Sequence, residues 1–239
     1  MKILALDSSG LVASVAVAED DILVAEYTVN YKKTHSQTLM PMLQAVKEMT
    51  ELDLESVDAI AIAAGPGSFT GLRIGSATAK GLGLALDKPI VEVPTVAGLA
   101  YNLWGSDKLI CPLMDARREQ VYTGLFRFEK EDNGYRMVTV KEQCAVGIAD
   151  MIEEINRLGE EVVFLGDGVP VYEKKLVEGL QVSYSFAPAH ANRQRAASVA
   201  ALACIYYKEG KMIPAGEHQP EYLRLSQAER ERMEQENGK

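Results

Sequence analysis

The pattern of apolar and polar positions predicts three successive strands at the amino-terminal end of the chain. Residues 2–7, 11–18 and 22–29 are aliphatic runs, and short polar turns at 8–10 and 19–21 separate them. Short aliphatic runs that are bounded by Ser, Gly and Asp are typical of strands joined by tight turns. We therefore expect a three-stranded meander here.

The apolar period changes from two to about 3.6 after residue 30, which predicts a helix over about 36–50. Ser36 is its expected N-cap, and Thr70 is a second cap candidate after the glycine-rich turn. The other elements of this half alternate strand and helix: a strand at 58–63, a helix at 70–86, a strand at 90–93 and a helix at about 95–104.

The second half of the chain begins in the same way as the first. Residues 108–128 read as strand, Asp-containing turn and strand. Further elements are expected as an apolar stretch at 135–140, a helix near 148–157, a strand at 162–165, a helix near 169–178 and a helix at about 196–209. Two tandem meander-plus-helix units predict a duplicated α/β architecture, with halves at 1–105 and 106–215 and a polar tail at 216–239. We expect the polar end of the chain, from residue 210 onward, to be frayed.

Composition narrows the classes of protein. The 239 residues are 47% hydrophobic and 25% charged, which is normal for a globular chain with a sizeable core. No apolar run reaches about 18 residues, and the amino-terminal end lacks a signal-peptide pattern, so a cytoplasmic protein without a membrane span is expected. Three scattered cysteines indicate neither a disulfide framework nor a zinc site. A net charge of −9 disfavours unaided binding to nucleic acid.

Two aspartate turns are candidates for a nucleotide site. Asp7-Ser8-Ser9-Gly10 follows a buried strand, and backbone N–H groups in such a turn can bind an anion. The alternative is a tight turn in which Asp7 accepts from its own backbone. Asp115 occupies the equivalent place in the second half, although Ala-Arg-Arg-Glu follows it. Gly166-Asp167-Gly168 lies at a strand–helix junction, where contact with a nucleotide is common, but glycine can serve turn geometry alone.

The glycine-rich helix that follows GPGSFTG carries two rows of small residues. One row is Gly71, Gly75, Ala79 and Gly83, and the other is Ala77, Gly81 and Ala85. GPGSFTG lacks the lysine of a Walker A loop. Each glycine inside a helix lowers its stability by roughly 1 kcal/mol relative to alanine, so close packing has to offset this loss. Packing on the sheet accounts for the small residues of one row, and contact with a partner would account for those of the other.

The helix expected at 36–50, together with His35 and Ser68, provides the remaining evidence on function. Three methionines within residues 40–49 make an adaptable surface of the kind used in binding, although a core helix is an equal reading. His35 is expected to make a hydrogen bond at the helix boundary. Ser68 lies in G-P-G-S-F without an evident base, so a peptidase is not indicated.

Taken together, several segments resemble the bacterial TsaB family, also called YeaZ, over nearly the whole chain and in the expected order. They are MKILALDSS, the THSQTLMPML run, AAGPGSFTGLRIGSATAKGLG, MDARREQVY and PEYLR at 220–224. The resemblance implies an actin-like ATPase superfamily (ASKHA) fold. It also implies a part in forming N6-threonylcarbamoyladenosine (t6A) at position 37 of tRNA.

The resemblance further implies a subunit that is not itself catalytic. In the family, TsaD transfers the threonylcarbamoyl group, TsaB pairs with TsaD, and the ATPase TsaE joins them. ATP and metal are therefore expected on TsaD and TsaE and no cofactor on this chain, and tRNA is expected to be met only through the complex. Thr95 and Leu99 stand where TsaD-like paralogues carry two metal-binding histidines, and neither side chain can replace an imidazole.

The family pairs the two helices of its first half with those of TsaD. By resemblance, the partner-binding residues are Leu39, Met40, Leu43, Gly75, Ala79 and Gly83. Without TsaD the same surface would form a homodimer. The competing hypothesis is a weak nucleotide-binding protein or ATPase that uses a degenerate site, made of Asp7, Ser8, Ser9, Asp115, Gly166, Asp167 and Gly168.

Overall fold

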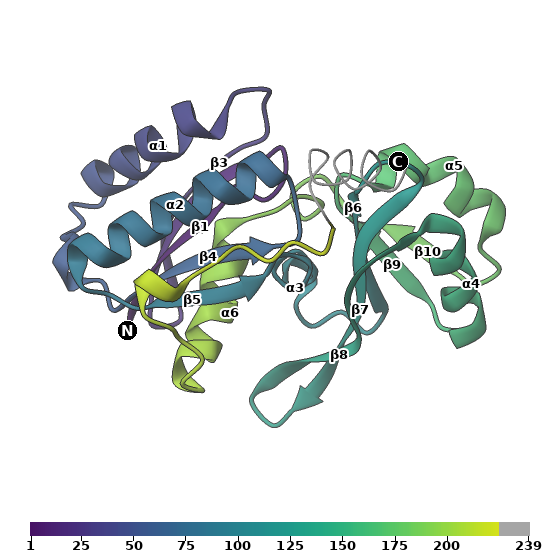
Figure 1. The fold of residues 1–239 in the computed structure, drawn as a ribbon. Helices are drawn as coiled ribbons and strands as arrows, with labels where there is room; N and C mark the ends of the chain where they lie inside the picture. The colour runs from purple at the N-terminus through teal and green to yellow at the C-terminus, as the bar shows by residue number, and fades with distance from the viewer. Residues whose placement is uncertain (225–239) are drawn as a thin grey trace, which may run out of the picture.

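A computed structural model describes residues 1–224, which form two five-stranded mixed sheets with helices on their faces (Figure 1). The first sheet contains β1 (Lys2–Asp7), β2 (Ala13–Glu19), β3 (Ile22–Val29), β4 (Ala59–Gly65) and β5 (Ile90–Pro94). The second contains β6 (Leu109–Asp115), β7 (Gln120–Glu131), β8 (Gly134–Gly147), β9 (Val162–Leu165) and β10 (Tyr184–Phe186).

The two sheets repeat one topology. The strand orders are β3-β2-β1-β4-β5 and β10-β9-β6-β7-β8. In each, the first three strands form an antiparallel meander, and the last two join parallel to the first strand through helical crossovers. The predicted tandem architecture is therefore confirmed.

Six α-helices are described: α1 (His35–Met49), α2 (Phe69–Leu86), α3 (Thr95–Ala100), α4 (Ile148–Leu158), α5 (Val169–Gly179) and α6 (Ala196–Lys208). Short 3-10 turns occur at Leu54–Ser56, Tyr101–Leu103 and Ala215–Glu217. None of the helices in residues 1–224 is both long and apolar enough to cross a membrane.

The elements stack in layers with three cores between them. Helices α1 and α2 cover the outer face of the first sheet, and α4 and α5 cover the outer face of the second. Helices α3 and α6 lie between the two sheets, in a core to which both sheets contribute. The expected second half, 106–215, included α6. That helix packs on β1, β2, β4 and β5 instead, because its small residues fit the alanine-rich inner face of the first sheet.

The helix caps differ from the prediction. Helix α1 begins after Thr34, so Ser36 lies inside the helix and is not its N-cap. Helix α2 is capped by Ser68, whose Oγ accepts from the Gly71 N–H at 3.3 Å, and Thr70 lies in the first turn. A cap needs an extended backbone and a side chain that reaches back, and Ser68 has both.

The chain after α6 is ordered by contacts, contrary to the expected fraying. Ile213 forms a bridge to Ile90 at the outer edge of β5. His218 is buried, and its Nδ1 lies 2.5 Å from Glu92 Oε1. Lys80 donates to the His218 carbonyl at 3.1 Å. Apolar and hydrogen-bonding groups spaced through a polar segment account for this packing, and the rest of the predicted tail, 225–239, lies outside the described residues.

A candidate functional cleft between the two halves

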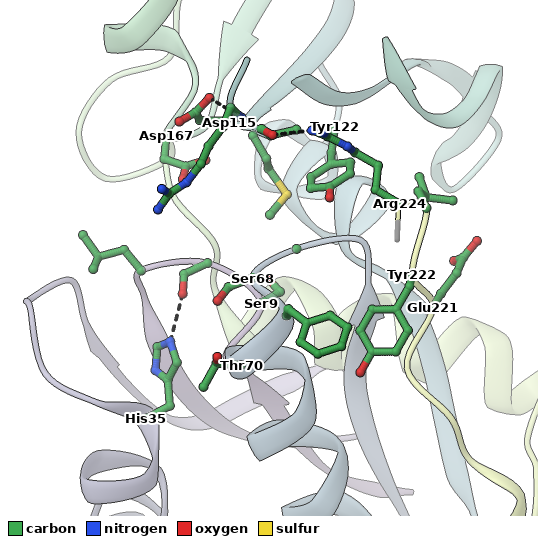
Figure 2. A pocket seen from close by; sticks show the side chains of 18 residues that line it. Ser9, His35, Ser68, Thr70, Asp115, Tyr122, Asp167, Glu221, Tyr222 and Arg224 are labelled. Carbon is green, nitrogen blue, oxygen red and sulfur yellow. Dashed lines mark hydrogen bonds between the residues drawn. The ribbon is translucent and has the colours of Figure 1, made fainter. Parts of the chain in front are cut away.

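A cleft of about 660 Å³ lies between the two halves (Figure 2). The turns after β1 and β4 and the start of α1 form its lower wall in the view. The turns after β6 and β9 form the opposite wall, and residues 221–224 close one side. These turns meet because the carboxyl ends of β1, β4, β6 and β9 point toward one junction.

The Asp7 turn is closed on itself. Asp7 Oδ1 accepts from the Ser9 N–H at 2.9 Å and from Ser9 Oγ at 2.6 Å. Ser8 Oγ donates to the Gly71 carbonyl at 2.9 Å. All three side chains are buried, and burial raises the pKa of Asp7 above its ordinary value. The reading of this turn as a tight turn in which Asp7 bonds its own backbone is confirmed.

The glycine-rich turn packs directly on the Asp7 turn. The Ser68 N–H donates to the Ser9 carbonyl at 2.6 Å. A Cβ at Gly67 would lie well under 3.0 Å from that same carbonyl oxygen, and a Cβ at Gly71 would lie as close to the Ser8 carbonyl oxygen. These glycines therefore let one turn approach another within the first half, and no room remains between the turns for a phosphate.

The Asp115 turn is open, although it uses the same local bond. Asp115 Oδ1 accepts from the Arg117 N–H at 2.9 Å and from the Tyr172 hydroxyl at 2.9 Å. Three consecutive residues of this turn, Arg117, Arg118 and Glu119, have φ of 60°, 55° and 59°. Left-handed conformations are unfavourable for residues with side chains, so this exposed turn stores backbone strain.

Gly166 and Gly168 serve the packing of the strand–helix turn on β6. A Cβ on either would press on the Leu113 carbonyl oxygen, and the Gly168 N–H donates to that oxygen at 2.9 Å. Asp167 projects into the cleft between them, and its Oδ1 is buried without a partner among the described residues. Burial raises the pKa of Asp167. Of the proposed nucleotide residues, Ser9, Asp115 and Asp167 thus line the cleft, while Asp7 and Ser8 lie behind it.

A segment near the end of the described chain forms a wall that the sequence did not predict. The Glu221 N–H donates to the Ala64 carbonyl at 2.7 Å, and its carboxylate accepts from Gln143 at 2.6 Å. The Tyr222 ring packs on Phe69 at 4.6 Å between centroids. Arg224 donates to the Ala116 carbonyl. The segment PEYLR, with an aromatic residue and an arginine in an otherwise polar tail, was the sequence signal that could have predicted this wall.

Polar and apolar side chains both line the cleft, and its two walls differ in charge. Asp115 and Asp167 lie on the side of the second half, together with Arg117, and hydroxyl groups of Ser68 and Thr70 lie opposite. Its size suits a ligand as large as a nucleoside. However, the N–H and hydroxyl of Ser9 already donate to Asp7, so this turn offers a phosphate fewer donors than expected. Nucleotide binding stays a prediction.

The two candidate peptidase residues both have structural partners. Ser68 Oγ caps α2, and His35 Nε2 donates to the Gly10 carbonyl at 2.9 Å. The expected hydrogen bond of His35 at a helix boundary is confirmed. No hydrogen bond between Ser68 and His35 occurs within residues 1–224, and an activated serine would need one.

The residues predicted to bind a partner lie on two helices that pack side by side on the first sheet. Five of the six are buried within the chain: Leu39, Leu43, Gly75, Ala79 and Gly83. A Cβ at Gly75 would press on Ser8 Oγ and Ile62. The first row of small residues therefore packs on the sheet, and contact of these residues with a partner stays a prediction. Of the six, Met40 alone is exposed.

The second row of small residues faces outward. Ala77, Gly81 and Ala85 are exposed, and a Cβ at Gly81 would meet no atom of the described chain within 4 Å. Met49 and Leu84 are also exposed on these helices. Contact of α1 and α2 with a partner stays a prediction, and this outer surface is the one that such a contact would use.

The positions compared with the paired histidines of TsaD-like proteins are part of the core. Thr95 Oγ1 accepts from the Gly65 N–H at 3.1 Å, and it is buried. Leu99 is buried among α3, α6 and both sheets. Both side chains therefore stabilise the junction between β4, β5 and α3.

Comparisons with known proteins agree on one family. The family model described as TsaD, tRNA N6-adenosine threonylcarbamoyltransferase, matches residues 23–232. The chain is 34% identical to the tRNA threonylcarbamoyladenosine biosynthesis protein TsaB of Bacillus subtilis, over 96% of each chain. It is 30% identical to the protein of the same name in Escherichia coli, over 94% of this chain and 95% of the other.

Solved structures agree as well. A Pseudomonas aeruginosa protein described as similar to the peptidase YeaZ superposes with a TM-score of 0.79 at 26% identity, covering 93% of this chain and 99% of that one. A YeaZ structure from the same organism gives a TM-score of 0.73 at 25% identity and the same coverage. With the duplicated topology, these likenesses confirm the expected actin-like ATPase superfamily fold.

Proposed function

The chain belongs to the TsaB family, whose relatives are named for tRNA threonylcarbamoyladenosine biosynthesis, and we propose that it acts in this modification as a partner subunit of TsaD. In this role it activates the threonylcarbamoyl transfer to adenosine 37 without carrying out the chemistry. A subunit activates in this way when it binds the competent state of its partner more tightly than the other states. TsaE joins the pair, and tRNA is met through the assembly.

The observation that supports this proposal is the outer surface of α1 and α2. A helix with exposed Ala77, Gly81 and Ala85 lets another backbone approach closely. A Cβ at Gly81 would meet no atom of the described chain within 4 Å, so close packing there does not explain a glycine that costs the helix roughly 1 kcal/mol. The flexible side chains of Met40 and Met49 would cover the rest of a contact surface. A partner at this surface would account for the glycine.

The test is a comparison of three variants in sedimentation with purified TsaD, with and without ATP. Gly81→Leu should weaken pairing with TsaD by at least about tenfold, because the larger side chain holds the partner away. It should also stabilise the free chain by up to about 1 kcal/mol, since leucine favours a helix more than glycine does. Gly81→Ala is the matched control and should disturb pairing far less.

Gly75→Leu separates a buried glycine from the exposed one. Its side chain would collide with Ser8 and Ile62, so this variant should unfold or aggregate, which circular dichroism and sizing would detect. If Gly81→Leu folds and pairs with TsaD as tightly as the unchanged chain, the outer surface is not the binding surface. Micromolar ATP binding by the isolated chain, without any pairing, would favour the nucleotide-binding alternative.

A further inference from the structure

The end of the described chain touches both halves of the molecule. Residues 221–224, here called the strap, lie along one side of the cleft (Figure 2). On the first half, the Glu221 N–H donates to the Ala64 carbonyl of β4 at 2.7 Å. On the second half, Arg224 donates to the Ala116 carbonyl, directly after β6. The strap therefore fastens the two walls of the cleft to each other.

The last residue of β4 makes room for the strap. Gly65 has a φ of 129°, which is unfavourable for a residue with a side chain. A Cβ at this position would lie 2.2 Å from the Glu221 carbonyl oxygen. Glycine thus lets the strap approach β4 closely, and the first half provides a specific seat for it.

One side-chain amide ties the strap to both halves at once. Gln143 lies in β8, and its Nε2 donates to Glu221 Oε2 at 2.6 Å and to the Gly65 carbonyl at 3.2 Å. A hydrogen bond to a carboxylate is stronger than one between neutral groups. Gln143 therefore links the second sheet to the end of β4 and to the strap.

The strap begins in exposed residues, whereas the chain just before it is buried. Tyr222 is 39% exposed although its ring packs on Phe69, and Glu221 is also exposed. Before the strap, His218 is 1% exposed, and its carbonyl accepts from Lys80 at 3.1 Å. Segments with few buried contacts open at a lower free energy than buried segments do. The strap can therefore detach while the chain before it stays in place.

We propose that the strap is a releasable latch on the cleft. When it is closed, it holds the two halves at a fixed separation. When it is released, the cleft widens, because the contacts with Ala64, Gly65 and Ala116 that span its side are lost. Helices α3 and α6 keep the halves joined through their shared core, so release changes the width of the cleft and leaves the fold intact.

Spin labels on the two halves measure this width in the isolated chain. Met49 on α1 is 87% exposed and Val177 on α5 is 51% exposed, so both can be changed to cysteine and labelled. Cys144 is replaced by serine in this background, whereas Cys111 and Cys204 are buried and stay. Pulsed electron resonance then gives the distribution of distances between the labels. A closed latch should give one narrow distribution.

Removing the side chains of the strap should open the latch. Tyr222→Ala combined with Arg224→Ala should shift most of the distribution to longer and broader distances, while circular dichroism stays unchanged. Glu217→Ala is the matched control, since Glu217 is exposed and lies before the strap, in the part of the chain that packs on α2. It should leave the distribution narrow. If the strap variant and this control give the same narrow distribution, the strap does not hold the halves together.

An exchange of two side chains tests the contact through Gln143. Gln143→Glu sets a second carboxylate against Glu221, and this repulsion should release the strap at neutral pH and low salt. Adding Glu221→Gln lets the amide at 221 donate to the new carboxylate, so the narrow distribution should return in large part. The exchanged pair still lacks the donor to the Gly65 carbonyl, so the return should be incomplete. An exchanged pair as broad as Gln143→Glu alone, or a narrow distribution in Gln143→Glu, would overturn the proposal.

Discussion

The turns after β1 and β6 occupy equivalent places in the two halves, but one is closed and the other is open. In both, the aspartate accepts from the backbone N–H two residues later, at 2.9 Å. Ser8 and Ser9 then let the first turn be buried under the glycine-rich turn, whereas Arg117 and Arg118 keep the second at the surface. The shared bond thus comes from the aspartate, and the residues after it decide whether the turn is buried or exposed.

The largest effect is expected from filling the contact between the turns. Gly67→Ala should destabilise the fold by about 3 kcal/mol or more, because its Cβ would press on the Ser9 carbonyl, which is held by Ser68. Gly168→Ala, at the corresponding junction of the second half, should cost less, about 1–2 kcal/mol, since its Cβ would lie 2.9 Å from the Leu113 carbonyl oxygen. Urea unfolding of both variants measures the difference, and equal costs would mean that the two junctions are equally tight.

A smaller effect is expected from removing each aspartate. Asp7→Ala leaves the buried N–H and hydroxyl of Ser9 without their acceptor and should cost about 2 kcal/mol. Asp115→Ala should cost under about 1 kcal/mol, because the Tyr172 hydroxyl can then donate to the Gln120 carbonyl instead and the Arg117 N–H can reach water. Chemical denaturation at neutral pH gives both values. If Asp115→Ala lowered the free energy of unfolding by more than Asp7→Ala does, the closed turn would not be the more stabilising of the two.

The smallest effect concerns pH. Burial raises the pKa of Asp7 above 3.8, so the folded chain binds its proton more tightly than the unfolded chain does. The stability that this proton contributes is present below about 3.8 and is lost as pH rises through the folded pKa. Asp7→Asn keeps an uncharged acceptor at every pH. The free energy of unfolding of this variant should therefore rise relative to that of the unchanged chain as the pH increases from 3. Unfolding free energies at pH 3 to 7 measure this gain.

A matched variant in the other half extends the pH comparison. Burial also raises the pKa of Asp167. The free energy of unfolding of Asp167→Asn should therefore also rise relative to that of the unchanged chain as the pH increases. The effect should be smaller than at Asp7, because the Asp167 side chain lies at the cleft and is not fully covered. A constant difference between Asp7→Asn and the unchanged chain from pH 3 to 7 would mean that the Asp7 pKa is the same in the folded and unfolded chains.

Local pattern predicted most elements and the duplication, because alternating apolar runs and helical periods are properties of neighbouring residues. The pattern could not assign α6 to a sheet, since small apolar residues such as Ala196, Ala200 and Ala203 fit either inner face. It also missed β10, which is only three residues long. Contacts such as that of His218 with Glu92 join residues far apart in the chain and leave no local signal.

The sequence predicted which turns hold the candidate site residues, but it did not predict the conformations of these turns. The aspartates marked the ends of β1 and β6, and glycines marked the turns after β4 and β9. The conformation of Arg117, Arg118 and Glu119 was not predictable, because these residue types rarely adopt positive φ. The outward row of α2 was visible in the sequence, but which of its two rows faces the sheet depends on the rotation of the helix, which packing decides.

The return of the chain to the first sheet has a consequence for biosynthesis. One face of that sheet is covered by α6, and its β5 edge by Ile213, so both are completed by residues that are synthesised after all ten strands. The nascent first half therefore exposes an alanine- and valine-rich sheet face through most of translation. Contacts of such long sequence separation slow folding, and exposed sheet surfaces recruit chaperones or aggregate. Nascent chains stalled before residue 196 should be held by chaperones, whereas release after residue 221 should free them.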